Sequence, residues 1–169
     1  MIKIELAEIS DLDRIMKIIE ACATDLISKN IFQWSEKYPN REVFKADIKK
    51  NELYVSKHKL EIIGCIVLCS IKDLEYKNVK WLTKDDQNLY IHRLAVDPTF
   101  QKKGVGKSLM DFSEEYAQEN GFKSVRLDTF SQNKRNNKFY KSRQYVQLSD
   151  VFFPMQSEFP FHCYEKIIS

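Results

Sequence analysis

A strand, a turn that contains two glycines and an amphipathic helix follow one another in the middle of the sequence, and this order constrains the fold more than any other feature. The strand is found in "LYIHRLAVDP" (residues 89–98) and the turn in "QKKGVG" (residues 101–106). From Val105 to Tyr116 the apolar residues recur at intervals of four, three and four, which predicts an amphipathic helix that Gly121 can close. A central strand that leads through a turn into a helix predicts a mixed α/β domain.

The apolar phase of the strand slips by one residue near Arg93. Leu89 and Ile91 lie at odd positions, whereas Leu94 and Val96 lie at even ones. A β-bulge produces such a slip because its extra residue turns the following side chains to the opposite face. A central strand that is buried on both faces gives the same pattern. The sequence leaves both interpretations open.

Further apolar patterns place strands and helices on both sides of this segment. Strands are expected at residues 2–6, 52–56, 60–70, 124–130, 145–148 and 161–168, and helices from a Ser10 N-cap to about Ala23, at 42–50 and at 133–143. The second and third strands should form a hairpin with its turn around Lys57 and His58. Residues 30–40 are expected to be irregular, and residues 71–87 are expected to be a loop or a ragged edge anchored by Trp81.

Composition and charge exclude several classes of protein. With 169 residues, of which 43% are hydrophobic, the chain can bury one core, and we expect a single domain over residues 1–169. A net charge of +3 is too small to indicate a surface coated with nucleic acid, although local basic patches remain possible, and it suits a small anionic ligand better. The apolar run 62–69 is too short to cross a bilayer, and the N-terminus lacks an apolar signal core, so we expect a cytoplasmic protein. The four cysteines show no Cys-x-x-Cys spacing, so buried free thiols are expected rather than a metal site or a disulfide.

Two familiar nucleotide-binding motifs do not match the glycine turn. A P-loop requires glycine at the position of Gln101, so "GKS" at residues 106–108 is not a Walker A motif. A dinucleotide fingerprint requires glycine at the position of Leu109. These mismatches count against a purine-nucleotide phosphotransferase.

The turn is nevertheless suited to phosphate groups. Gly104 and Gly106 lack side chains, so their backbone N–H groups can approach a pyrophosphate closely, and the helix start adds unpaired donors with a partial charge of roughly +0.5. Lys102, Lys103 and Lys107 would reinforce this field. If the turn is considered alone, a tight turn with solvated lysines is the alternative.

The segment "LAVDPTFQKKGVGKSLM", together with Asn133 and Tyr140 in "NKRNNKFYKSRQYV", resembles the GNAT N-acetyltransferase superfamily, whose acetyl-CoA motif is Gln/Arg-x-x-Gly-x-Gly/Ala. The resemblance covers essentially the whole chain and is sharpest over residues 90–145. It implies an α/β (α+β) fold, in which about four helices flank a mixed, mostly antiparallel central sheet of about six to seven strands. It also implies that the bulged central strand splays from its neighbour.

The resemblance further implies that acetyl-CoA (coenzyme A) is the cofactor. In such enzymes the backbone of the bulged strand pairs with the pantetheine arm of the cofactor, and the pyrophosphate lies on the turn. An asparagine at the start of the next helix forms a hydrogen bond with the pantetheine arm. The expected cofactor-binding residues are Leu94, Ala95, Val96, Gln101, Lys102, Lys103, Gly104, Val105, Gly106, Lys107, Ser108 and Asn133.

Tyr140 falls where the family places a phenol near the cofactor sulfur. A phenol with a pKa of about 10 is protonated at neutral pH and can donate to the departing thiolate, so we expect Tyr140 to be the general acid. The alternative is a core aromatic residue. The chain carries Gln144 and Tyr145 where Gly-Phe is common in the family, and Lys102 and Lys103 where glycine is often seen at one position.

An amine acceptor must lose a proton before it attacks, because an alkylammonium of pKa about 10.4 is almost entirely charged at neutral pH. His92 on the central strand is the first candidate for the base, since an ordinary histidine pKa of about 6.5 suits the role. A histidine on a strand is more often structural, however. Asp128 and Glu165 are weaker candidates, and a chain of waters would need no single base.

Aromatic residues in the irregular segments are the candidates for the acceptor site. In the enzymes that this chain resembles, the region between the first two helices often forms one side of the acceptor site. Trp81 and "SDVFFPMQSEFPF" (residues 149–161) could add to the wall, or the aromatic residues could simply cover the edge of the core. The expected substrate-binding residues are Phe32, Trp34, Tyr38 and Asp128.

The primary hypothesis is therefore an N-acetyltransferase that moves acetyl from acetyl-CoA to a primary amine of a small molecule or peptide. The amine would attack directly, without a metal ion or an acyl-enzyme. The alternative is a non-catalytic module that binds acyl-CoA as a sensor. We expect a monomer or homodimer that binds neither nucleic acid nor membrane.

Overall fold

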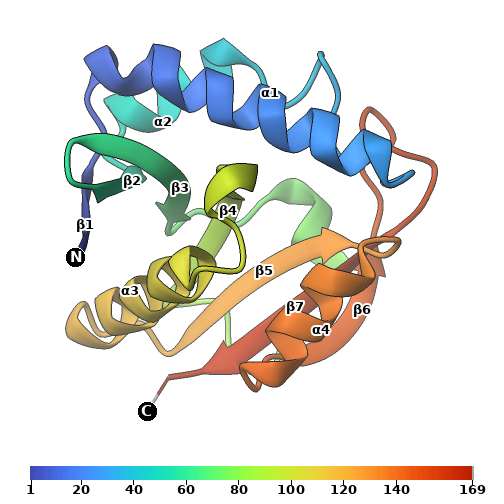
Figure 1. Cartoon of the computed structure of the whole chain (residues 1–169). Coiled ribbons are helices and arrows are strands. Elements are labelled where there is room, and N and C mark those ends of the chain that lie inside the picture. The colour runs from blue at the N-terminus through green and yellow to red at the C-terminus, as the bar shows by residue number, and fades with distance from the viewer. Residues whose placement is uncertain (169) are drawn as a thin grey trace. The chain divides into compact units, whose positions relative to one another are not determined.

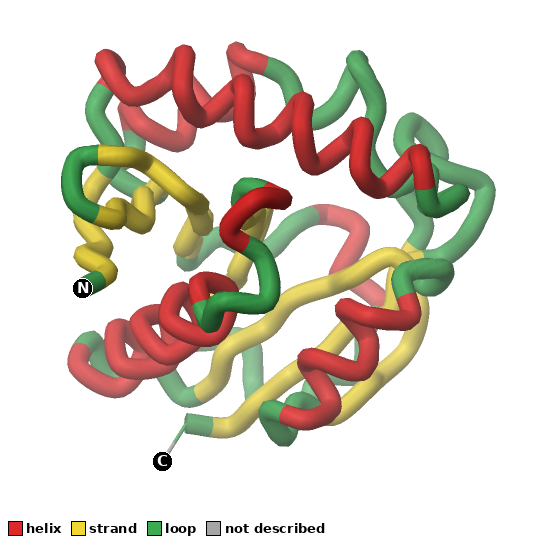
Figure 2. Tube along the Cα trace, viewed as in Figure 1, coloured by secondary structure: helices red, strands yellow, loops and turns green. Residues whose placement is uncertain are grey.

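The computed structural model describes residues 1–168 (Figures 1 and 2). These residues form two compact units. The first unit comprises residues 1–68 and 92–113, and the second comprises residues 69–91 and the chain from residue 114 onward. The elements are β1 (Ile2–Leu6), η1 (Ile9–Asp11), α1 (Leu12–Ser28), α2 (Arg41–Lys49), β2 (Leu53–His58), β3 (Glu61–Cys69), η2 (Leu74–Asn78), β4 (Asn88–Val96), η3 (Pro98–Phe100), α3 (Val105–Glu119), β5 (Ser124–Phe130), α4 (Lys134–Ser142), β6 (Val146–Val151) and β7 (Phe161–Ile167).

The strands are hydrogen-bonded in the order β1-β2-β3-β4-β5-β7-β6. The pairs β1–β2, β2–β3, β5–β7 and β6–β7 are antiparallel, whereas β4 and β5 are parallel. The boundary between the two units falls within β4, after Ile91. The predicted fold class, a mixed and mostly antiparallel sheet with four helices, is confirmed.

In the first unit α1 and α2 lie side by side (Figure 1). The helix α1 buries one face because Ile15, Ile18, Ile19 and Cys22 recur at helical spacing. These side chains belong to a hydrophobic core cluster that also contains Val55 of β2.

The first helix differs from the prediction at both ends. The chain enters it through η1, in which Asp11 Oδ2 accepts the N–H of Glu8 at 2.9 Å, and Ser10 lies within this short turn. The predicted Ser10 N-cap was therefore wrong. The helix also continues past Ala23 to Ser28, because Leu26 still packs against the core.

The predicted hairpin is confirmed, but its turn lies at Lys59 and Leu60 rather than around Lys57 and His58. A register shift between Ser56 and Lys57 lets β2 continue through His58. Lys59 then takes up the left-handed conformation, with φ of 56°.

The first half of β4 agrees with the interpretation of a strand that is buried on both faces. Leu89, Tyr90 and Ile91 are all buried, as in a strand covered on both faces. Arg93 then adopts a left-handed conformation with φ of 49°, at the position where the apolar phase slips. This irregular backbone lies where the bulge is predicted, and the bulge itself stays a prediction.

A buried ion pair holds this irregular residue. Arg93 Nε and Nη2 each donate to the Asp47 carboxylate of α2 at 2.8 Å, and Nη1 donates to Tyr38 Oη at 3.0 Å. The side chains of Arg93 and Asp47 are only 13% and 6% exposed. Since removal of one partner leaves the other charge buried, the pair is critical for stability.

We expect Asp47→Ala to lower the free energy of unfolding by about 3–5 kcal/mol, because it leaves Arg93 without its anion. In a domain of this length that corresponds to a fall in Tm of roughly 10 °C, which a thermal melt would detect. The control is Asp13→Ala, which removes the exposed pair with Arg41 and should change the free energy by less than about 1 kcal/mol. Equal effects of the two variants would contradict the role given to the Arg93 pair.

In the second unit α4 covers one face of β5, β7 and β6 (Figure 1). On this face Asn136 Nδ2 donates to Thr129 Oγ1 at 3.4 Å. Residues of the segment 71–87 bond to side chains of β5 and β7 that point away from α4, namely Arg126 and Glu165.

The segment 71–87 is more ordered than the predicted loop. It contains η2, whose Tyr76 is completely buried, whereas Trp81 is only half-buried. Tyr76 rather than Trp81 is therefore the main anchor, and the prediction for Trp81 was wrong in this respect.

Two residues after the last residue of each of the helices α1, α2, α3 and α4, the chain has a residue of positive φ: Asn30, Asn51, Gly121 and Gln144. At the end of α4, Tyr145 N donates to Tyr140 O at 3.1 Å and Gln144 N donates to Lys141 O at 3.0 Å. This is the hydrogen-bond pattern of a Schellman motif. Glutamine thus occupies the left-handed position that usually carries glycine.

Gln144→Gly should raise the free energy of unfolding by about 0.5–1 kcal/mol. Glycine avoids the cost of a left-handed side chain but makes the unfolded chain more flexible, and the first effect is the larger. Chemical denaturation would measure the gain. Gln118→Gly, which puts glycine inside α3, should instead lower the free energy by about 0.5–1 kcal/mol; a loss of stability in both variants would contradict this account.

Cys22, Cys65 and Cys163 are buried free thiols, as predicted, whereas Cys69 is partly exposed. Within residues 1–168, no helix is both long enough and apolar enough to cross a membrane.

Candidate active site

The glycine turn begins where β4 ends, and hydrogen bonds of Asp97 stabilise it. Asp97 Oδ1 accepts hydrogen bonds from Thr99 N at 2.9 Å and Thr99 Oγ1 at 2.7 Å. Its Oδ2 accepts from Arg14 Nη2 at 2.7 Å, and Gln101 Nε2 donates to Val96 O at 3.1 Å. These bonds, together with the ionic partner, hold the pKa of Asp97 below its usual range against the effect of burial.

The backbone of the turn is left-handed at two residues. Gly104 has φ of 83° and Lys102 has φ of 62°. Lys102 thus adopts a backbone conformation that glycine would adopt more easily.

The two glycines leave open space at the start of α3. A Cβ at Gly104 would meet no described atom within 4 Å, and one at Gly106 would contact Val96 Cγ2 at 3.8 Å. Packing of the described residues therefore does not require these glycines. An external group that approaches the backbone would require them.

The amide groups of the first helical turn are available in this space. The first intrahelical bond runs from Ser108 N to Gly104 O at 2.9 Å. The N–H groups of Val105, Gly106 and Lys107 precede it and have no carbonyl partner within the helix. Such donors at a helix start bind phosphate, so the residues present fit the diphosphate of coenzyme A.

The three lysines lie around this turn and are exposed. Lys103 Nζ donates to Thr99 O at 3.0 Å, and Lys107 Nζ pairs with Asp111 at 2.6 Å. The first turn of α3 contains no acidic residue. A phosphate there would thus meet positive charge and N–H donors.

The strand residues Leu94, Ala95 and Val96 lead into the turn. Val96 O already accepts from Cys22 Sγ at 3.2 Å as well as from Gln101. The Ala95 carbonyl lies so close to β3 that a methyl group at Gly64 would come within 2.8 Å of it. Gly64 is thus a structural requirement that the sequence pattern did not reveal.

His92 is poorly suited to act as a base at neutral pH. Burial, followed by the charge of Arg93, lowers its pKa to about 4. The imidazole is therefore neutral at pH 7 but holds a proton weakly, whereas an effective base has a pKa near the working pH.

The pKa of Asp128 is shifted in the opposite direction, upward to near neutrality. Asp128 lies on β5 in the second unit. Burial raises its pKa to about 7; the hydrogen bond from Tyr76 lowers the pKa, and the charges of Asp73 and Glu75 raise it. Glu165 differs, because the buried Arg126 guanidinium donates to it at 3.0 Å and its bonds hold its pKa below the usual range. Of these two carboxylates, Asp128 is the better base.

Tyr140, also in the second unit, lies on α4 and is 5% exposed. Its ring contacts those of Tyr145 and Tyr164, each with centroids 5.9 Å away. Burial raises the pKa of its phenol above the ordinary value, so Tyr140 carries its proton at neutral pH. Tyr140 thus packs like a core aromatic and holds a proton that it could donate, although burial makes the phenol a weaker acid than an exposed tyrosine.

Asn133 caps α4. Its Oδ1 accepts the N–H of Asn136 at 3.1 Å, and the residue is 3% exposed. The predicted helix start is therefore confirmed, and the contact with the cofactor arm stays a prediction.

The predicted acceptor residues of the first unit separate into different environments. Trp34 is 9% exposed and belongs to the core cluster, which favours the alternative that it covers the core. Phe32 is 58% exposed, and Tyr38 accepts the hydrogen bond of Arg93.

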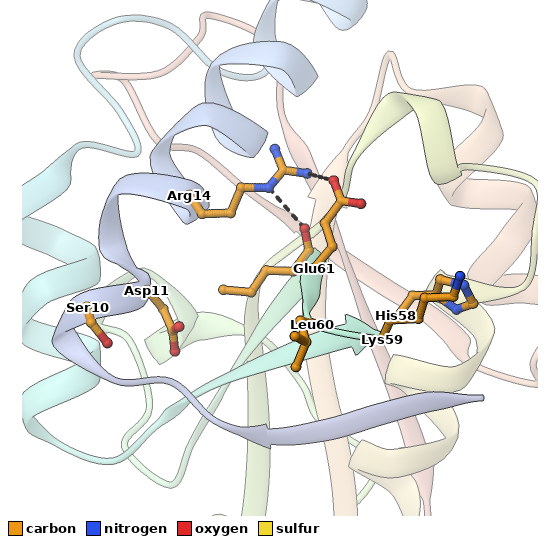
Figure 3. A pocket seen from close by; sticks show the side chains of 8 residues that line it. Ser10, Asp11, Arg14, His58, Lys59, Leu60 and Glu61 are labelled. Atoms are coloured by element: carbon orange, nitrogen blue, oxygen red, sulfur yellow. Dashed lines mark hydrogen bonds and ion pairs between the residues drawn. The ribbon is translucent and has the colours of Figure 1, made fainter.

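A cavity of about 720 Å³ lies in the first unit, where the start of α1 meets the β2–β3 hairpin (Figure 3). Arg14 crosses it, donating to Ile62 O at 3.1 Å and Glu61 Oε1 at 3.2 Å. None of the predicted site residues lines this cavity, and Arg14 connects it to Asp97. The lining residues are Ser10, Asp11, Arg14, His58, Lys59, Leu60, Glu61 and Ile62.

Comparison with known proteins identifies the family. The model of the acetyltransferase (GNAT) family matches residues 12–145. No curated protein matches the chain significantly. Solved structures share its fold: a GNAT-family acetyltransferase from Streptococcus agalactiae 2603 aligns with a TM-score of 0.86 at 22% identity, covering 99% of this chain and 96% of that one.

Two further structures support the same fold. A GNAT-family acetyltransferase from Listeria monocytogenes 4b F2365 gives a TM-score of 0.78 at 18% identity, over 98% of this chain and 94% of that one. The PaiA N-acetyltransferase from Thermoplasma acidophilum, solved in complex with coenzyme A, gives 0.73 at 19% identity, over 99% of both chains. With its family match over most of its length and its glycine turn suited to a diphosphate, this chain belongs to the acetyltransferase (GNAT) family and is an acetyl-CoA-dependent acetyltransferase.

Proposed function

We propose that the protein transfers acetyl from acetyl-CoA to a primary amine by direct attack of the amine. The observation that carries this proposal is the presence in the second unit of the partly exposed Asp128, whose pKa is near neutrality, and of the buried Tyr140, which keeps its proton at neutral pH. Groups whose environments separate their pKa values in this way are typical of an acid and a base.

The base removes the ammonium proton that prevents the acceptor nitrogen from attacking the thioester. An acceptor of pKa about 10.4 arrives as an ammonium ion, and a carboxylate with a pKa of about 7 is half ionised at pH 7 and can accept that proton. Asp128 thus replaces His92 as the first candidate for the base.

The acid completes the transfer. As the carbon–nitrogen bond forms and the carbon–sulfur bond breaks, the departing thiolate takes a proton from the Tyr140 hydroxyl. The attacking nitrogen loses two protons in all. The Asp128 carboxylate takes one from the ammonium ion before attack, and the second, lost as the amide forms, restores the Tyr140 hydroxyl, so the products are the amide, the free thiol and a protonated Asp128.

The turn of the first unit holds the donor substrate in this proposal. Acetyl-CoA supplies an activated acetyl thioester. The N–H groups of Val105, Gly106 and Lys107 bind its diphosphate, and the exposed Lys102 and Lys103 add positive charge. Leu94 and Asn133 remain the expected contacts of the pantetheine arm.

A thiol-release assay with a panel of primary amines tests the proposal. We expect one free thiol per N-acetylated product, identified by mass spectrometry, and no release with matched alcohols. Intact protein incubated with acetyl-CoA alone should keep its mass, since no acyl-enzyme forms. A stable acetyl adduct that an amine then consumes would contradict direct attack; acetyl-CoA binding without turnover of any amine would favour the sensor.

A further inference from the structure

We propose that Tyr76 is a positioning residue for the reaction, whose hydroxyl holds the Asp128 carboxylate ready to accept the proton of the amine. The inference rests on the proposed function of Asp128 as the base. It concerns the second unit alone, and it gives a role to the segment 71–87.

The contact itself is direct. The Tyr76 hydroxyl donates a hydrogen bond to Asp128 Oδ2. The Tyr76 side chain is completely buried, whereas Asp128 remains partly exposed. One face of the carboxylate is thus fixed by the protein, while part of the group stays accessible.

Aromatic rings and the turn η2 hold Tyr76 in place. Its ring contacts Trp81 edge-on at a centroid distance of 5.3 Å and lies 5.9 Å from the ring of Tyr90. The Arg126 guanidinium lies 4.5 Å from the Trp81 ring centroid. The Tyr76 hydroxyl therefore has little freedom to leave Asp128.

The segment 71–87 is bonded to Arg126 and Glu165, which form a buried ion pair between β5 and β7. Arg126 is fully buried; its Nη2 donates to Thr83 O at 2.6 Å and its Nη1 to Asp85 Oδ1 at 2.6 Å. Glu165 of β7 accepts the N–H of Leu82 and, at 2.5 Å, the hydroxyl of Thr83. A loop that served only as a connection would not need such buried polar anchors.

The groups around Asp128 make this hydrogen bond important. Asp73 and Glu75 face it from the segment 71–87, and like burial they raise its pKa. Cys163 is opposite it on β7, and burial keeps that thiol neutral. Tyr140 of α4 is also close enough to interact with its charge. The Tyr76 hydroxyl opposes burial and the two acidic neighbours by stabilising the ionised carboxylate.

The test is Tyr76→Phe, which keeps the ring and removes the hydroxyl. Loss of a hydrogen bond to a charged group should shift the acid limb of the pH–rate profile to higher pH, by about one to two pH units. At pH 7 the rate should fall by roughly 5- to 50-fold and recover partly at higher pH, while the KM for acetyl-CoA stays within about twofold. A carbon-13 NMR titration of the Asp128 carboxyl should show the same upward shift without any turnover.

Controls separate this inference from the proposed function. Tyr116→Phe removes the hydroxyl of a tyrosine on α3 and should leave the acid limb unchanged. Tyr76→Met also removes the Tyr76 hydroxyl, so it should shift the acid limb to the same extent, provided that a thermal melt shows the variant to be folded. If Asp128→Asn abolishes turnover but the Asp128 midpoint is the same in wild type and both Tyr76 variants, the positioning role is wrong. If Asp128→Asn keeps the wild-type rate and profile, the base assignment itself is wrong.

Discussion

Tyr140→Phe should lower kcat by about 10²- to 10⁴-fold, the range expected when a general acid is removed. The phenylalanine ring preserves the contacts with Tyr145 and Tyr164, so the loss should reflect the missing proton. The KM for acetyl-CoA should change little, because the turn that binds the diphosphate is untouched. Steady-state kinetics with a saturating amine would measure both constants.

The matched control is Tyr145→Phe. Tyr145 is as buried as Tyr140 and donates to Glu114 Oε1 at 3.2 Å. Its loss should lower stability by about 1 kcal/mol and change kcat by less than about threefold. If Tyr140→Phe behaved like this control, Tyr140 would be a core aromatic and would leave the mechanism.

Gly104→Glu should weaken acetyl-CoA binding by roughly 10- to 100-fold, equal to about 1.4–2.7 kcal/mol. Gly104 has φ of 83°, so a side chain strains the turn. The added carboxylate also repels the diphosphate that the first-turn amides are proposed to hold. The measurement is the KM or Kd for acetyl-CoA.

Two variants separate strain from charge. Gly121→Glu places the same side chain at a residue of similar φ, 72°, at the far end of α3, and should leave acetyl-CoA binding unchanged. Gly104→Ala adds strain without charge and should have an intermediate effect. Equal losses in Gly104→Glu and Gly121→Glu would show that the diphosphate does not depend on the turn.

Much of the fold could be predicted because its elements have regular apolar periods. The helix that follows the glycine turn and the strand SVRLDTF were found at their observed positions. The segment 71–87 has no such period, since Tyr76 is fixed by Asp128 and by the aromatic residues around it, far away in sequence. Contacts of that kind leave no local pattern.

The glycine turn could also be predicted, because its chemistry lies in consecutive residues. The base could not, because burial determines which group has a useful pKa. His92 and Asp128 have ordinary pKa values of about 6.5 and 3.9, which favour the histidine, but the structure lowers the first to about 4 and raises the second to about 7. A sequence alone does not show that reversal.

The central claim is that main-chain amides at the start of α3 bind the diphosphate of coenzyme A. Nitrogen-15 NMR during titration with coenzyme A tests it directly. The amide resonances of Val105, Gly106 and Lys107 should move strongly and saturate together, while pantetheine, which lacks the diphosphate, leaves them nearly unchanged. Amides that stay in place when coenzyme A saturates the protein would contradict the account.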